Sequence, residues 1–558
     1  MKKNIFFLIA LLILFAPFIT RPAFPATEAD VAHPKTADVA HPAKADAAHP
    51  TAAEAADPET TKKIVQELKV RLERWDVAQI WPVVQAALAK NPKDPDLLET
   101  ASQIAFQRGD YQEALKLMKQ SLEAGGENEQ RRGFALFIEQ TINVLAPYKR
   151  FETPHFIIAL DEEKDGILAG YITETLEETY RIMAQNYGFN PDEKVRVEIF
   201  PDARSFYLAS TLSVRDIEVT GAVGLTKFNK IQLLSPRALV QGYRWLDAVS
   251  HEYMHYLIVK KTSNKAPIWF HEGLAKHEET RWRNGPTYLS ALYQTLLARA
   301  QEENRLIAFK RMEPSLIYLD TPEDVQQAYA QAASAIEFII HSVGYEGLKR
   351  IMDRMALSKS EGAAESIQKV MGMSFLEFEG KWAAYLAAKN LKPVEGVSVH
   401  HNKVKEGEVD TDRMDLQEIK SLVARNRTHL GDKLKERGRL EAAVIQYRRA
   451  LEQTDDAVPI RNRLSSALTS LGRYDEALDI IKQTLELAPD NPTSYTQLGR
   501  IYLLRNNFEG AKEAFEESIQ INPFDPAIHV GISNAYAMLG DAIDSSKERD
   551  VAQKLLRR

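Results

Sequence analysis

The spacing of apolar residues changes along the chain and predicts a different kind of structure in each of three stretches. In residues 61–145 apolar positions recur every three or four residues, as in helices with one buried face. In residues 151–393 the short runs HFIIAL and KVRVEIF predict strands, and helical patterns lie between and after them. In residues 422–558 the helical period returns. The pattern predicts an α+β block between two all-helical regions.

Two further patterns lie inside the α+β block. DGILAGYITETLEETYRIMAQNYG predicts a long amphipathic helix between the two strands. TGAVGLTKFNKIQLLS alternates and contains glycines, as a hairpin or an edge strand does. Downstream, YRWLDAVSHEYMHYLIVKK predicts a helix, and WFHEGLAKHEE predicts another after the turn NKAP.

The C-terminal region repeats with a period of 34 residues. Turn-forming residues, small residues and prolines follow this interval: Gly438, Gly472, Asn506 and Gly540; Ala443, Ala477 and Ala511; Pro489 and Pro523. This region resembles a tetratricopeptide array of about four units, in which such residues occupy the turn between helices and the close contacts of paired helices. The resemblance implies protein partners, bound through the concave surface of the array.

The N-terminal helical region resembles the same kind of repeat. The turn Gly109-Asp110-Tyr111 and the small residue Ala114 follow a helical run, and IVQELKVRLERWDVAQIWPVVQAALAKNP before it looks like a degenerate copy. We expect tetratricopeptide-like helices in residues 61–147 and C-terminal repeats in residues 421–558. The α+β block then occupies residues 148–393, and residues 394–420 form a linker.

The first residues predict export. The basic start MKKN precedes an apolar run at residues 5–19, which has the length of a signal peptide and is shorter than the roughly 20 residues of a spanning helix. We expect cleavage after Ala26 or Ala29, with residues 1–26 as the signal peptide; an uncleaved N-terminal anchor is the alternative. The chain is then periplasmic or otherwise extracytoplasmic, or anchored to the inner membrane. Only this anchor would contact a membrane.

Within residues 27–60, residues 28–58 repeat an ADVAHP-like unit rich in alanine and proline, without an apolar period that could build a core. We expect a disordered linker here. Its three histidines, His33, His41 and His49, could bind metal weakly, but a plain spacer is the simpler interpretation.

Composition narrows the choice of function. The chain has 558 residues, 44% hydrophobic and 27% charged, with a formal net charge of −7. These values are typical of a globular protein and do not suggest a nucleic-acid partner, which would need a concentrated basic face. The absence of cysteine excludes disulfides, thiolate metal ligands and lipoprotein attachment.

The sequence HEYMH, residues 251–255, contains candidate metal ligands and a candidate general base. On a helix His251 and His255 project from one face, one turn apart, and can bind one Zn²⁺. Glu252 can then take a proton from a water on the metal as a general base. A catalytic zinc needs a third protein ligand, and Glu272, on the following helix, is the candidate. We expect one zinc ion per chain. The alternative is that these residues are ordinary polar side chains of two helices and bind no metal.

Carboxylates near the metal should orient the ligand imidazoles. Asp247 lies four residues before His251, and Glu279 lies seven residues after Glu272, so each shares a helix face with a ligand. Either is a candidate orienting residue. A solvated surface charge is the alternative for both.

HExxH followed by the Glu of WFHEGLA resembles the gluzincin zinc metallopeptidases, above all the peptidase MA-like domains that occur beside tetratricopeptide repeats. The similarity extends to QQAYAQAASAIEFIIHSVGYEGLKRIM and FEGKWAAYL, so it covers about 240 residues. It implies a thermolysin- or aminopeptidase-like α+β fold, with His251, His255 and Glu272 as zinc ligands and Glu252 as the base. It also implies that Tyr329 hydrogen-bonds the oxyanion of the tetrahedral intermediate; a core tyrosine is the alternative.

The sequence departs from the aminopeptidase pattern at one residue and in one segment. His271 stands where those enzymes usually have asparagine. It could compete as a ligand, but consecutive helix residues diverge by about 100°, so we favour a hydrogen bond near the site. The GAMEN-type segment that grips a free amino terminus is not evident, and GAVGL (residues 221–225) offers at most an edge strand for an extended substrate. Exopeptidase activity is therefore disfavoured.

The sequence predicts an exported zinc endopeptidase that acts on protein or peptide substrates, with repeats that recruit proteins. A repeat scaffold with a weak or inactive zinc domain is the alternative from another class. Metal-dependent hydrolysis of a non-peptide amide, for example in the cell wall, is a third.

Overall fold

The computed structural model describes residues 58–557, apart from residues 127, 213–221, 286, 358–361, 396, 398–402, 406–414, 418 and 455–457. The described chain divides into two compact units, residues 58–143 and residues 144–557. The predicted signal peptide or anchor, nearly all of the linker at residues 27–60 and much of the segment 394–420 lie outside the described residues. Within the part of the chain that the structure describes, no helix combines the length and the apolar character needed to cross a membrane.

The first unit consists of helices, as the apolar period predicts. They are α1 (Pro58–Glu73), α2 (Val77–Lys90), α3 (Pro95–Arg108), α4 (Tyr111–Gly125) and most of α5 (Glu129–Leu145). Gly109 ends α3 in the left-handed conformation, with φ of 86°, which glycine adopts without strain. Ala114 is fully buried, and its carbonyl accepts a hydrogen bond of 2.6 Å from the hydroxyl of Ser102. The predicted turn and small residue therefore join α3 and α4 into a closely packed pair.

The second unit begins with a small mixed sheet. Its strands are β1 (Lys149–Glu152), β2 (Phe156–Leu160), β3 (Val195–Phe200), β4 (Gly224–Lys227) and β5 (Lys230–Leu234), in the order β1-β2-β3-β5-β4. β2, β3 and β5 run parallel, whereas β1 and β4 pair antiparallel with their neighbours. The predicted strands and hairpin are present; β1 was not predicted. β4 forms one edge of the described sheet.

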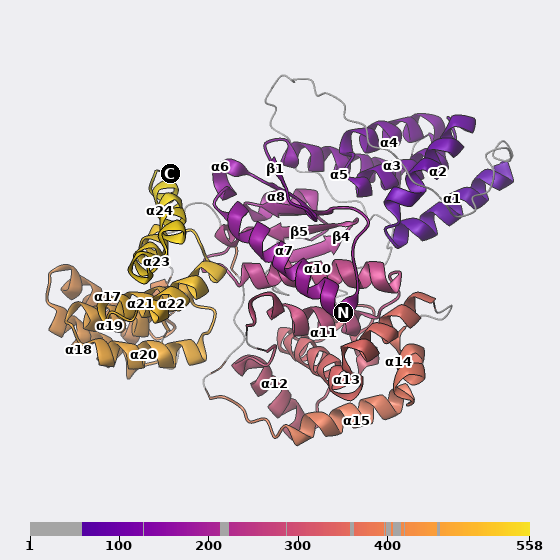
Figure 1. The fold of residues 1–558 in the computed structure, drawn as a ribbon. Coiled ribbons are helices and arrows are strands. Elements are labelled where there is room, and N and C mark those ends of the chain that lie inside the picture. The colour runs from indigo at the N-terminus through magenta and orange to yellow at the C-terminus, as the bar shows by residue number, and fades with distance from the viewer. Residues whose placement is uncertain are drawn as a thin grey trace, which may run out of the picture. The chain divides into compact units, whose positions relative to one another are not determined.

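Helices pack against this sheet (Figure 1), and one of them, α10 (Trp245–Thr262), carries the first histidine–glutamate pair. The predicted long helix is α7 (Leu168–Tyr187), and α10 contacts α7, β4 and β5. Of the eighteen residues of α10, fourteen are buried. A helix buried on almost every side is a core element, so its polar side chains need partners inside the protein.

Further helices complete this block. They are α6 (Glu162–Asp165), α8 (Ala203–Ala209), η1 (Pro236–Ala238), α11 (Ile268–Glu278), η2 (Arg281–Arg283), α12 (Ala291–Glu302), η3 (Phe309–Met312), η4 (Leu316–Tyr318), α13 (Pro322–Leu357), α14 (Ala363–Met371) and α15 (Phe375–Ala388). The resemblance to peptidase MA-like domains implies a helix within residues 326–352. In the structure α13 covers these residues and is interrupted at Gly344, with φ of 67° and ψ of 178°.

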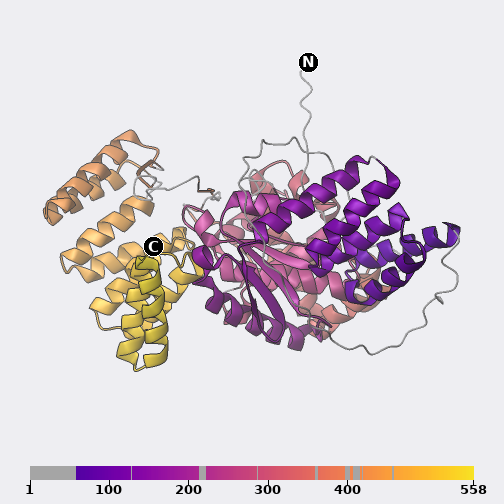
Figure 2. The same cartoon turned by 90° about the horizontal axis from the view of Figure 1, so that it is seen from above.

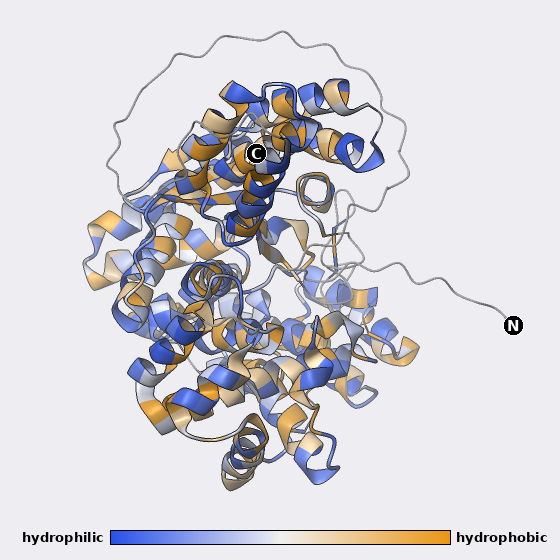
Figure 3. Cartoon of the chain, turned by 90° about the vertical axis from the view of Figure 1, so that its right-hand side faces the viewer, coloured by the Kyte–Doolittle hydropathy of each residue, from blue (hydrophilic) through white to orange (hydrophobic). Residues whose placement is uncertain are grey.

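Residues 422–556 form helix pairs, which Figure 2 shows packed side by side. The helices are α17 (Leu422–Glu436), α18 (Leu440–Leu451), α19 (Val458–Ser470), α20 (Tyr474–Leu487), α21 (Pro492–Leu504), α22 (Phe508–Ile521), α23 (Pro526–Leu539) and α24 (Ala542–Leu556). The periodic turn residues Gly438, Gly472, Asn506 and Gly540 all have positive φ. The periodic alanines Ala443, Ala477 and Ala511 are fully buried. Polar and apolar residues alternate along the helices of the described chain, as expected when one face of each helix is buried (Figure 3).

Candidate metal centre

Two helices bring the predicted ligands together. α10 places His251 and His255 one turn apart, and the chain then reverses through Ser263 and Asn264, both with positive φ. α11 starts after Pro267 and carries Glu272. Ten of the eleven residues of α11 are buried.

A close backbone approach fixes the position of α11. A Cβ atom on Gly273 would lie 2.4 Å from the carbonyl oxygen of Ala332 in α13, which is far inside van der Waals contact. Only glycine allows α11 to pack this tightly on α13. The glycine after the predicted third ligand therefore helps to place that ligand.

The three candidate donor atoms converge. His251 Nε2 lies 3.1 Å from His255 Nε2, and Glu272 Oε2 lies 3.6 Å from each of them. Donors at 2.0–2.1 Å from a tetrahedral Zn²⁺ are separated by about 3.3–3.4 Å. The triangle therefore has the size that a zinc ion with three protein ligands requires. Imidazole and carboxylate are also the ligand types that zinc accepts.

Glu252 lies beside this triangle on α10. Its carboxylate is within 4.8 Å of the ligand atoms of both histidines. Burial raises the pKa of Glu252, although the neighbouring histidines oppose this effect. A carboxylate next to the ligands, with a raised pKa, is suited to accept a proton at neutral pH.

Strand β4 holds the Glu252 side chain in place. The hydroxyl of Thr226 lies 2.6 Å from Glu252 Oε2, and Thr226 is buried. A Cβ atom on Gly224 would lie 2.5 Å from Glu252 Oε1, so only glycine leaves room for the carboxylate. The alternating positions 224 and 226 thus face α10 together. Neither residue was singled out from the sequence; the alternation of the strand was the only available signal.

Glu279 contacts the first histidine. Its Oε2 lies 3.1 Å from His251 Nδ1, and its Oε1 lies 2.7 Å from Lys276 Nζ. Burial lowers the pKa of His251, but hydrogen bonds to Glu272 and Glu279 outweigh burial and raise the pKa from 6.5 to about 9. An N–H at Nδ1 that donates to Glu279 leaves Nε2 free to face a metal.

Asp247, the other candidate orienting carboxylate, has different partners. Its carboxylate accepts hydrogen bonds from Arg283, at 2.8 and 2.7 Å, and from the indole of Trp282, at 3.0 Å. The structure therefore brings Glu279 to the imidazole of His251, a candidate ligand, and Asp247 to the segment after α11. Spacing on the helix could not separate the two, because both share a face with a ligand.

His271 is fully buried, and both of its ring nitrogens lack a hydrogen-bond partner. Its ring centroid is 5.6 Å from that of His255, whose Nδ1 also lacks a partner. Burial lowers the pKa of His271 to about 3, so its ring is neutral. The hydrogen bond expected for His271 is therefore not present in the structure, because complete burial leaves both of its ring nitrogens without a polar partner.

Tyr329 of α13 is partly buried near the same carboxylates. Burial, followed by the charges of Glu272, Tyr293 and Glu252, raises the pKa of Tyr329 well above its usual value. Its phenol therefore keeps its proton at neutral pH and can donate a hydrogen bond.

Comparisons with known proteins assign the parts of the chain. The family model of the peptidase MA superfamily matches residues 177–388, and tetratricopeptide repeat models match residues 68–129 and 456–523. The chain therefore carries a peptidase MA superfamily domain flanked by tetratricopeptide repeats. The convergent residues all lie within the matched domain.

A comparison with curated proteins finds no match. Among solved structures, the crystal structure of MamA is 19% identical and covers 26% of this chain and 87% of MamA, with a TM-score of 0.23. A MamA fragment from Desulfovibrio magneticus is 18% identical; the match covers 26% of this chain and 87% of the fragment, with a TM-score of 0.23. A thermophilic tetratricopeptide protein of Thermus thermophilus is 22% identical; the match covers 24% of this chain and 74% of that protein, with a TM-score of 0.23. At these scores the likeness supports no inference about this chain.

Proposed function

We propose that this protein is an exported zinc metallopeptidase with a gluzincin-like, thermolysin- or aminopeptidase-related domain, and that it cleaves within protein chains. The observation that carries the proposal is the triangle of His251, His255 and Glu272 donor atoms, with edges of 3.1, 3.6 and 3.6 Å. Its size matches one zinc ion. Glu252 stands beside it as the proton acceptor.

The residues of the chain divide the work. His251, His255 and Glu272 hold the metal, and Glu279 orients the imidazole of His251. Glu252 takes the proton of the attacking water and later passes it to the leaving amine, which is the role of a general base and acid. When bound, Zn²⁺ supplies a Lewis acid that lowers the pKa of water and polarises the scissile carbonyl.

Tyr329 is the proposed donor to the negative charge that develops on the carbonyl oxygen. Its phenol is protonated at neutral pH, as this role requires, and the charges of Glu272 and Glu252 that raise its pKa support a position near these carboxylates. A hydrogen bond that exists only in the transition state accelerates the reaction without tightening substrate binding.

The edge strand β4 is the proposed binding site for the substrate backbone. β4 pairs with β5 on one side and carries Thr226 and Gly224 next to the base. An extended peptide added to this edge would lie beside Glu252. Backbone pairing does not require a free amino terminus, which favours endopeptidase activity.

Export and recruitment complete the proposal. The apolar run at residues 5–19 and its basic flank support export. The tetratricopeptide repeats support protein–protein interaction, and the proposal assigns to them the recruitment of substrates or partners.

The test compares the parent protein with Glu252→Gln and Glu272→Ala. Zinc content is measured by mass spectrometry, and hydrolysis is measured on an unfolded protein such as casein. We expect about one zinc ion per chain in the parent and in Glu252→Gln, hydrolysis by the parent alone, and loss of zinc in Glu272→Ala. His271→Ala is the matched control for the neighbouring position and should keep its zinc.

Three outcomes would contradict the proposal or its assignment of ligands. A parent without bound zinc would remove the metal centre. Bound zinc with no hydrolysis by either protein would favour the alternative function, a repeat scaffold with an inactive zinc domain. Loss of zinc in His271→Ala would make His271 a ligand.

A further inference from the structure

The C-terminal repeats contact the helix that carries HEYMH. The indole N–H of Trp245, the first residue of α10, donates a 3.0 Å hydrogen bond to the carbonyl of Ile519 in α22. The N–H of Tyr243 donates a 3.0 Å bond to the carbonyl of Ile521. A Cβ atom on Gly242 would lie 2.3 Å from that carbonyl oxygen. The start of α10 therefore packs against the C-terminal end of α22.

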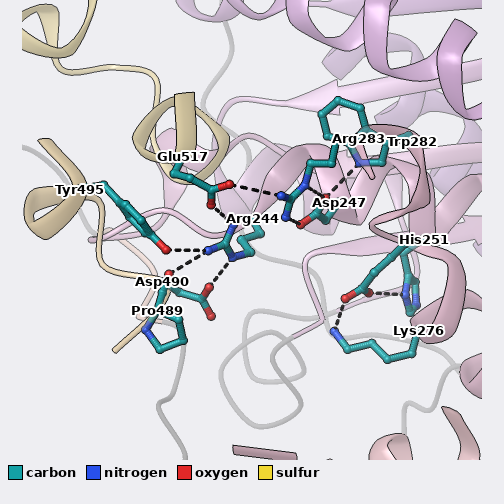
Figure 4. Close-up of polar contacts among 11 residues, drawn as sticks. Arg244, Asp247, His251, Lys276, Trp282, Arg283, Pro489, Asp490, Tyr495 and Glu517 are labelled. Carbon is teal, nitrogen blue, oxygen red and sulfur yellow. Dashed lines mark hydrogen bonds and ion pairs between the residues drawn. The ribbon is translucent and has the colours of Figure 1, made fainter. Parts of the chain in front are cut away.

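One carboxylate of the array bridges two arginines of the peptidase domain (Figure 4). Glu517 of α22 lies 2.7 Å from Arg244 Nη1 through Oε2 and 3.2 Å from Arg283 Nη1 through Oε1. Arg244 also lies 2.6 Å from Asp490 Oδ1 and donates to the carbonyl of Pro489 at 2.8 Å. Glu517 thus balances two guanidinium groups that otherwise repel each other.

Arg283 also connects the two helices that carry the proposed ligands. Arg283 binds both carboxylate oxygens of Asp247, at 2.8 and 2.7 Å. Asp247 lies one turn before His251 on α10, whereas Arg283 follows Glu279 in the segment after α11. Paired, nearly parallel hydrogen bonds of this kind fix orientation as well as distance. The Asp247–Arg283 pair therefore anchors the segment that follows α11 to the start of α10.

A second contact site restrains the array. The phenol of Tyr171 in α7 donates to Glu548 of α24 at 2.8 Å, and Lys547 lies 2.7 Å from Glu174. Contacts at α7 and at α10 involve different repeats. Two separate sites hold the array in one orientation.

We propose that the C-terminal repeats are part of the support of the metal centre, with Glu517 as a positioning residue that acts through Arg283 and Asp247 on the two ligand helices. The inference rests on the proposed zinc site. It assigns the array a second role besides recruitment, and it means that the face formed by Asp490, Tyr495 and Glu517 is occupied by the peptidase domain. Partners must bind elsewhere on the array.

The test reverses the charge of Glu517 in the full-length protein. The dissociation constant for Zn²⁺ is measured by competition with a chromogenic chelator, and the absorption spectrum of the Co²⁺-loaded protein reports ligand geometry. For Glu517→Lys we expect a dissociation constant about tenfold higher, the lower end of the range for residues that orient metal ligands, and an altered Co²⁺ spectrum. Glu513→Lys is the matched control: Glu513 lies one turn earlier on α22 and is exposed, and its variant should behave like the parent.

The design separates the two proposals. A parent that binds no zinc overturns the proposed function and this inference with it. A parent that binds zinc, with the same affinity and Co²⁺ spectrum in Glu517→Lys, overturns this inference alone. If Glu517→Lys does not fold, as judged by circular dichroism, Glu517→Gln is measured instead, and an unchanged affinity there has the same meaning.

Discussion

The hydroxyl of Thr226 lies 2.6 Å from Oε2 of Glu252, so the edge strand of the sheet directly holds the proposed catalytic base. The contact joins β4 to α10, which are adjacent in space but belong to different parts of the sequence. It fixes the direction of the carboxylate beside the metal ligands.

Thr226→Val should lower kcat about tenfold and leave KM nearly unchanged, because a hydrogen bond to a charged group contributes about 1.5–3 kcal/mol and here orients the base. Steady-state hydrolysis of a fluorogenic peptide measures this. Thr226→Ser, which keeps the hydroxyl, should retain most of the activity. Equal losses in both variants would argue against the hydrogen bond.

Gly224→Ala should abolish most hydrolysis while zinc remains bound. The new methyl group would lie 2.5 Å from Glu252 Oε1 and would push the carboxylate aside. The matched control is Gly380→Ala, because a Cβ atom there meets nothing within 4 Å. Full activity of Gly224→Ala would show that the carboxylate need not lie where the structure has it.

Glu279→Gln should weaken zinc binding by about 10- to 100-fold, because the partner that orients His251 is changed. Competition with a chelator measures the effect. Glu302→Gln, at an exposed position on α12, is the control for loss of a carboxylate. An unchanged zinc affinity in Glu279→Gln would remove Glu279 from the support of the site.

Zinc affinity should rise with pH up to about 9. In the metal-free protein the pKa of His251 is raised from 6.5 to about 9, so this histidine holds a proton at neutral pH, and a metal must displace it. Each unit of pH below this value should weaken binding by up to about tenfold. Calorimetric titration in two buffers of different ionisation enthalpy should show about one proton released at pH 7.5. Binding without proton release would contradict this.

Asn506→Gly should leave the stability nearly unchanged, whereas Asn506→Ala should lower the unfolding free energy by about 1 kcal/mol. Asn506 has φ of 58° at a turn where the other repeats have glycine. A left-handed backbone conformation costs residues with a Cβ atom about 1–2 kcal/mol, and it costs asparagine less than most. Thermal unfolding followed by circular dichroism checks both variants. A more stable Asn506→Ala would contradict the conformational argument.

The repeats could be predicted because their determinants are local. Glycine or asparagine at the turn and alanine at the close contact recur every 34 residues, and each residue acts within its own helix pair. The strands β2 to β5 and the helix α7 could be predicted from strand and helix patterns in the same way, whereas β1 could not. The break in α13 at Gly344 could not be predicted from the sequence, because one glycine inside a helical pattern is usually tolerated.

The sequence by itself determined that His251 and His255 share one face of a helix, because a spacing of four residues is about one helical turn. Only the tertiary structure decided how their neighbours are used. It directed Glu279 to His251 and Asp247 to Arg283, brought Thr226 to Glu252, and placed Glu517 of the repeats against Arg244 and Arg283. These pairs are 28, 36, 26, 273 and 234 residues apart. Local spacing says which way a side chain leaves its own helix, but packing of distant elements decides what it meets.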